Sequence, residues 1–183
     1  MDEGLISRRY AKALFRHAGG RDLQELIYGK MKSFQENAAA HPGLQKALQN
    51  PMLPSKTKEQ LLATAMGIHP AGEDIPAIRR FIRLLIRNRR EMHAKAISRM
   101  YEEIYRTARG ISRVKVTTAV SLSPEMAGKV EAFARGRAGE NLEFIYKVEP
   151  AIVGGIILEI GDRQYDASVS RKLKEIRGEF LKK

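Results

Sequence analysis

The spacing of apolar residues changes once along this chain, near Gly110, and that change limits the folds available to it. Before Gly110 the apolar residues recur every three or four positions, which is the period of an amphipathic α-helix. After it, Val114, Val116, Thr118 and Val120 alternate with other residues, which is the period of a half-buried β-strand. The sequence therefore predicts a helical first part and a mixed second part.

Residues 1–108 are predicted to form six amphipathic helices joined by short connections, as in a helical bundle. Pro51 and Pro54 interrupt the chain before the fourth helix. A capping-box pattern over residues 57–60 predicts that this helix starts there. The sixth helix is predicted to run from about residue 92 to residue 108, where the helical pattern ends.

Residues 111–183 are predicted to form a smaller unit of strands and helices. After the first strand, further alternation predicts strands at residues 142–148 and 153–160. A last helix is predicted to begin at Ser168 or Ser170, since either hydroxyl can cap it. We therefore predict an α+β fold, with an N-terminal six-helix bundle followed by a small C-terminal α+β domain.

The predicted first and fifth helices are apolar over more of their surface than one neighbouring helix would cover. In residues 5–18 the polar side is reduced to a stripe of three basic residues, and after Pro76 two apolar stripes lie side by side. The apolar residues are Ile6, Tyr10, Ala11, Ala13, Leu14, Phe15 and Ala18 in the first helix and Ile78, Phe81, Ile82, Leu84 and Leu85 in the fifth. Both helices therefore have apolar surface for a second contact.

The formal net charge of +12 is concentrated in one stretch, residues 79–115, which holds twelve Lys and Arg against three Glu. Such a stripe attracts nucleic acid, an anionic membrane surface or an acidic protein. A solvated helix face is the more common explanation of a charge run. A basic nucleic-acid- or ribosome-binding protein is the alternative function that this stretch supports.

The sequence predicts no catalytic residue, no cofactor and no metal site. It has no Cys, and its four His residues are far apart. Asp162 and Asp166 flank a predicted hairpin, where turn and cap roles are more common than Mg²⁺ binding. Gly154-Gly155 is followed by more strand rather than by a helix N-terminus, which excludes a phosphate loop and predicts a bulge or a close backbone approach. We therefore predict that the protein is not an enzyme.

Five segments carry a further signal when they are read in order. They are Ile6–Phe15 with its Tyr-Ala-Lys-Ala core, Asn50-Pro51 followed by Ser55 and Lys58, Phe81–Arg90, Val114–Ser123, and Gly154-Gly155 followed by Gly161-Asp162, Asp166, Ser168 and Leu173. Each segment is a weak motif by itself. Together, over residues 6–177, they resemble the delta subunit of the F-type ATP synthase, a relative of the mitochondrial oligomycin-sensitivity-conferring protein.

This resemblance implies a non-catalytic stator subunit that resists the torque of the rotor. In that family the helical part binds the N-terminal helix of an alpha subunit of the catalytic head, in a groove between its first and fifth helices. Tyr10, Ala13 and Leu14 would line one wall of that groove here, and Leu84 with Phe81 the other. The alternative is that these five residues fill the core of the bundle. The C-terminal part would bind the b subunits of the peripheral stalk.

The resemblance also implies a location at the cytoplasmic face of the bacterial inner membrane, as a peripheral protein. The longest weakly polar stretch, residues 151–160, is far shorter than the roughly 20 apolar residues of a membrane helix. The protein would reach the membrane only through the complex, and no nucleic-acid partner is expected.

Overall fold

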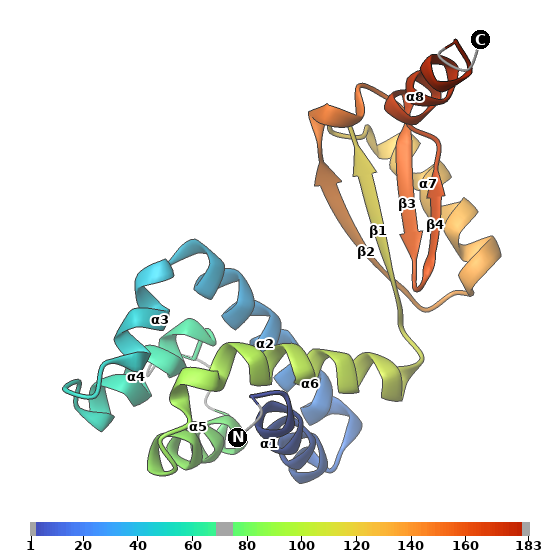
Figure 1. The fold of residues 1–183 in the computed structure, drawn as a ribbon. Coiled ribbons are helices and arrows are strands. Elements are labelled where there is room, and N and C mark those ends of the chain that lie inside the picture. Colours follow the sequence, from blue (N-terminus) through green and yellow to red (C-terminus); the bar gives the residue numbers. More distant parts are fainter. Residues whose placement is uncertain (1–2, 69–74, 181–183) are drawn as a thin grey trace. The chain divides into compact units, whose positions relative to one another are not determined.

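A computed structural model of the protein describes residues 3–68 and 75–180 (Figure 1). The chain divides into two compact units, which we call the N-terminal unit, Met1–Ala108, and the C-terminal unit, Arg109–Lys183. The first is built from α-helices and the second combines helices with a four-stranded sheet. The predicted α+β class is therefore confirmed.

The described part of the N-terminal unit contains six α-helices. They are α1 (Glu3–Ala18), α2 (Arg21–Ala40), α3 (Pro42–Gln49), α4 (Ser55–Ala65), α5 (Pro76–Arg87) and α6 (Ala94–Arg109). Helix α1 contacts both α2 and α5, and α4 contacts both α2 and α5. Their apolar faces meet in a core whose largest fully buried side chains include Phe34, Leu62, Ile78, Ile82 and Tyr101.

Two helix starts differ from the sequence-based prediction. Helix α4 begins at Ser55, with Pro54 as its N-cap residue, so Thr57 lies inside the first turn and the predicted capping box is wrong. The fixed φ of Pro54 suits the extended backbone before the helix, and the N-cap is therefore Pro54, three residues before Thr57. A short 3₁₀ turn, Glu91–His93, precedes α6, which begins at Ala94 rather than near residue 92.

The C-terminal unit is a four-stranded sheet in the order β2-β1-β3-β4. The strands are β1 (Ser112–Thr118), β2 (Leu142–Val148), β3 (Ile156–Ile160) and β4 (Arg163–Asp166). Strand β1 pairs in parallel with β2 and antiparallel with β3, and β3 pairs antiparallel with β4. A parallel pair needs a crossover, which here contains α7 (Pro124–Ala138).

Helix α7 forms the core of the C-terminal unit together with one face of the sheet. Val114, Val116 and Leu158 from the strands pack with Ala134 from the helix, and all four are buried. Tyr146 of β2 donates a hydrogen bond to Glu131 of α7, with 2.7 Å between the oxygens. Burial and this bond raise the pKa of Tyr146 to about 12, so the phenol keeps its proton and the bond further into the alkaline range than an ordinary tyrosine does.

The Gly154-Gly155 pair lies in a close backbone approach, one of the two alternatives that the sequence left open. Strand β3 begins at Ile156 rather than at Val153, because a 3₁₀ turn and the two glycines precede it. Gly155 has φ of +77°, and a Cβ there would lie 2.2 Å from the carbonyl oxygen of Ala167. Only glycine fits a backbone of this conformation at this distance.

The last helix, α8 (Val169–Phe180), is capped by Ser168, which settles the choice between Ser168 and Ser170. The Ser168 hydroxyl accepts a hydrogen bond of 3.2 Å from the backbone N–H of Arg171. The backbone N–H of Ser168 in turn donates to Asp166, at 2.9 Å. Hydrogen bonds from the Ser168 side chain and backbone lower the pKa of the Asp166 carboxyl. Asp166 thus makes a turn bond to the residue that caps α8, one of the turn and cap roles that the sequence favoured over Mg²⁺ binding.

Candidate protein-binding site

A hollow of about 540 Å³ lies between α1 and α5 in the N-terminal unit. We call it the α1–α5 groove. Three residues of its lining are apolar or aromatic residues of α1, one is a leucine of α5, and the others are polar residues at the rim. They are Ile6, Arg9, Tyr10, Ala13, Leu84, Asn88 and Arg90. The two helices that the sequence marked as unusually apolar therefore meet at a surface hollow.

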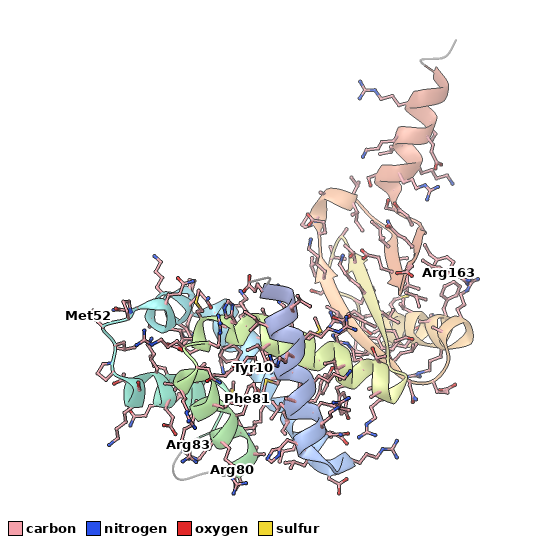
Figure 2. All side chains as sticks on the ribbon, turned by 60° about the horizontal axis from the view of Figure 1, so that its bottom comes forward. Tyr10, Met52, Arg80, Phe81, Arg83 and Arg163 are labelled. Carbon is pink, nitrogen blue, oxygen red and sulfur yellow. The ribbon has the colours of Figure 1, made fainter. Side chains whose placement is uncertain are left out.

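Tyr10 connects the two walls of the groove. Its ring packs edge-on against Phe81 of α5, with 6.5 Å between the ring centres (Figure 2). Its hydroxyl oxygen accepts a hydrogen bond of 3.0 Å from the side-chain amide of Asn88. Contacts at two points hold the ring in place, so a ligand would meet a preformed wall.

The five residues predicted to bind a partner fall into two groups. Tyr10, Ala13 and Leu84 line the groove, and Leu84 keeps 43% of its surface exposed. Leu14 and Phe81 lie in the core, with 2% and 6% of their surfaces exposed. In the structure of the subunit alone, these two residues therefore fill the core, which is the alternative to a binding role.

Sequence reasoning missed the rim of the groove. Arg9, Asn88 and Arg90 line it, together with the apolar Ile6. Asn88 and Arg90 lie at the end of the segment Phe81–Arg90, which supports the family resemblance but carries no sequence signal of a binding role. Both charged residues of the lining are basic, so the groove favours an apolar partner with carboxylates at its edges.

The turn after α5 places Asn88 and Arg90 at the groove. The backbone N–H groups of Arg89 and Arg90 donate to the carbonyls of Ile86 and Leu85, at 3.0 and 2.8 Å. This is the Schellman pattern, in which the residue after the cap adopts positive φ and is usually glycine. Here it is Arg89, with φ of +53°. The backbone of a residue that carries a Cβ is strained in this conformation.

Replacing Arg89 by glycine is expected to stabilise the N-terminal unit by about 0.5–1 kcal/mol, because it relieves the strain of positive φ. The matched control is Arg87→Gly, which removes the same charge from the helical end of α5. The control should lower stability by about 0.5–1 kcal/mol, since glycine is a poor helix former. Thermal unfolding of the two variants measures the difference, and equal destabilisation by both would show that Arg89 is not strained.

The basic stretch 79–115 is divided between the two units. It runs through α5 and α6 of the N-terminal unit and into β1 of the C-terminal unit. Some of its cations pair with acids in the fold: Arg106 lies 3.2 Å from Glu102, and Lys115 lies 2.7 Å from Glu159. Part of the positive charge is therefore compensated within each unit.

A second apolar surface lies on α8 in the C-terminal unit. Val169, Leu173 and Ile176 follow helical spacing and each keeps more than two fifths of its surface exposed. Val153 is also exposed, and the 3₁₀ turn just before it, Pro150–Ile152, contacts α8. An unpaired apolar stripe on an amphipathic helix is suited to packing against another helix.

Within residues 3–68 and 75–180, no group of three or more His, Asp or Glu side chains is placed to hold a metal ion. Over the same described ranges, none of the helices combines the length and the apolar character needed to cross a bilayer.

Comparison with known proteins identifies the family. The family model described as ATP synthase delta (OSCP) subunit matches residues 6–180. The ATP synthase subunit delta of Parabacteroides distasonis is 35% identical over 181 residues, covering 99% of this chain and 98% of that protein. The subunit delta of Phocaeicola vulgatus is 32% identical over 180 residues, covering 98% and 96%.

A solved structure shows the same fold. A chain of the Toxoplasma gondii mitochondrial ATP synthase hexamer aligns with a TM-score of 0.69 and 20% identity, over 96% of this chain and 97% of that one. Sequence and fold therefore agree over nearly the full length. The chain belongs to the ATP synthase delta (OSCP) subunit family, the non-catalytic delta subunits of the F-type ATP synthase.

Proposed function

We propose that this delta subunit is a stator that links the catalytic head of the ATP synthase to its peripheral stalk and resists rotor torque. The N-terminal unit binds the N-terminal helix of an alpha subunit in the α1–α5 groove. The C-terminal unit binds the membrane-anchored b subunits through the exposed apolar stripe of α8. The protein is then peripheral, on the cytoplasmic face of the bacterial inner membrane, and reaches the membrane through its partners.

The observation that carries this proposal is the groove itself. Its walls combine small Ala13 with the fixed ring of Tyr10 and the exposed Leu84, opposite one another on two adjacent helices. A small residue lets an incoming helix approach closely, and a fixed aromatic ring offers contact area at little cost in side-chain entropy. Arg9 and Arg90 at the rim suit a helix that carries acidic residues beside its apolar face.

The proposed function is mechanical, and neither binding surface needs a catalytic residue. A stator must hold two partners at once while force acts between them, so the strength and the rigidity of each contact determine its function. The two apolar surfaces lie on different units. Each can therefore be disabled without touching the other.

A reciprocal pair of variants tests both contacts. Leu84→Asp should weaken binding of an alpha-subunit N-terminal peptide at least tenfold, because it places a carboxylate in an apolar wall, and should leave b-subunit binding unchanged. Leu173→Asp should do the reverse. Both leucines are exposed, so thermal stability should change by less than about 0.5 kcal/mol. Titration calorimetry with the peptide and with a soluble b fragment gives the affinities.

The control for the groove is Leu5→Asp, since Leu5 is an exposed leucine of α1 that does not line the groove. It should bind the alpha-subunit peptide like the unmodified protein. If Leu84→Asp bound the peptide normally, or if its melting temperature collapsed, the assignment of the groove would be wrong.

A further inference from the structure

The N-terminal unit contains a second and larger hollow, of about 790 Å³, on a different face of α5 from the groove. It lies between the end of α3, the start of α4 and the last turn of α5, and no residue lines both hollows. Four large apolar side chains belong to its lining, and we call them its floor. The floor residues are Leu48, Leu53, Ile86 and Met92.

Cations surround this floor in excess over acids. The basic residues of the lining are Lys56, Lys58, Arg83, Arg87 and Arg89, and the acidic ones are Glu59 and Glu91. Lys58 pairs with Glu91 at 2.6 Å, and Arg83 lies 3.8 Å from Glu59. Within the described part of the chain, Lys56, Arg87 and Arg89 have no acidic partner. We call this hollow the basic cavity.

We propose that the basic cavity is a second docking site, for an acidic segment of a partner protein that places apolar side chains on the floor and carboxylates beside Lys56, Arg87 and Arg89. The charge of such a segment complements that of the cavity, because three cations of the lining have no acidic partner among the described residues. Apolar contact supplies affinity, while the surrounding charges select and orient the partner. The proposal does not depend on the occupant of the α1–α5 groove.

A protein segment fits the lining better than nucleic acid does. Proteins that bind single strands without sequence preference stack the bases on aromatic side chains, and none of the residues that line the basic cavity is aromatic. A phosphate backbone would meet the cations but would leave the four apolar floor residues in contact with water. Apolar side chains on a partner would cover that floor instead.

The conformation of Arg89 supports the same assignment. Asn88 and Arg90 line the groove, whereas Arg89 between them lines the basic cavity. The positive φ of Arg89 accounts for this change of direction. Strained residues persist where the surrounding structure holds them, and they gather at binding sites. One turn of the chain thus supplies polar side chains to two separate surfaces.

The test uses the full-length protein carrying Leu84→Asp, so that the groove cannot take up the probe. The probe is a fluorescein-labelled synthetic peptide of about 16 residues, with leucines at helical spacing and glutamates between them. We expect micromolar binding that weakens at least tenfold when Arg87→Gln and Arg89→Asn are combined. Asparagine is chosen at position 89 because it tolerates positive φ.

The matched control is Lys46→Gln with Arg80→Gln, which removes two exposed cations of the same unit that do not line the basic cavity. Its affinity should change less than twofold. The proposal is overturned if the peptide does not bind, if a twin with Gln for every Glu binds equally, or if the control loses as much affinity. Tighter binding of single-stranded RNA, lost in the same Arg87 and Arg89 variant, would assign the cavity to nucleic acid instead.

Discussion

Replacing Gly155 by alanine is expected to destabilise the C-terminal unit by about 3–5 kcal/mol. Positive φ at a residue with a Cβ costs roughly 1–2 kcal/mol. The new methyl group would also lie 2.2 Å from the carbonyl oxygen of Ala167, a backbone atom that cannot move aside as a flexible side chain can. The segments that carry Gly155 and Ala167 must separate to accommodate it.

That separation breaks specific contacts. Backbone hydrogen bonds join Ala167 to Ile156 at 2.9 Å and Val169 to Gly154 at 3.0 Å. They hold the start of β3 against the start of α8, and each is worth about 1 kcal/mol. Because a unit of this size is stabilised by only about 4–11 kcal/mol, the variant should lose much of its cooperative folding.

Hydrogen exchange of the β1 and β3 amides in the full-length protein measures this effect unit by unit. The matched control is Gly136→Ala in α7, where a Cβ would have no neighbour within 4 Å. That control should stabilise the helix by about 0.5–1 kcal/mol, because alanine is the better helix former. Unchanged protection of β3 in Gly155→Ala would mean that the close approach to Ala167 is absent in solution.

Replacing Lys58 by methionine is expected to destabilise the N-terminal unit by about 3–5 kcal/mol, the usual cost of removing one partner from a buried ion pair. The Lys58 ammonium lies 2.6 Å from Glu91 Oε1, and the two side chains are only 8% and 10% exposed. The second carboxylate oxygen of Glu91 is buried and has no hydrogen-bond partner within the described residues. Without Lys58, a buried carboxylate would lose its compensating charge.

Two controls separate the lost pair from lost packing. The double variant Lys58→Met with Glu91→Met should recover most of the stability, because an apolar pair can replace a buried ion pair at little cost. Lys129→Met removes an equally short ion pair, 2.6 Å to Glu125, whose side chains are 66% and 77% exposed. It should cost less than about 0.5 kcal/mol. Urea unfolding followed by circular dichroism gives the three values, and failure of the double variant to recover would contradict the explanation.

The sequence predicted most of the architecture because hydrophobic period and turn chemistry are local signals. Strand β2 was predicted at the bounds that the structure shows, and Ser168 was one of two predicted caps. The start of α4 was wrong because Pro54 and the capping-box residues competed, and the pattern alone could not rank them. The turn at Arg89 was not foreseen, since no glycine marks it.

The candidate site was predictable only in outline. The width of an apolar stripe shows that a helix has more than one contact, but it does not show which residue faces a neighbour and which faces solvent. Helix α1 contacts both α2 and α5, and Leu14 is covered in that packing whereas Ala13, one residue earlier, stays exposed. Lys58 and Glu91 are 33 residues apart, so their pairing depends on tertiary packing that no local pattern encodes.

The pairing order of the sheet also determines when the C-terminal unit can form during synthesis. Strand β1 is central and leaves the ribosome first, but its parallel partner β2 follows only after α7, and β3 later still. A nascent chain that ends in α7 therefore carries β1 with both edges unpaired, and such edges readily associate with other chains. By then the N-terminal unit, proposed to bind the catalytic head, is fully synthesised. The C-terminal unit, proposed to bind the stalk, cannot yet fold because β2, β3 and β4 are still missing.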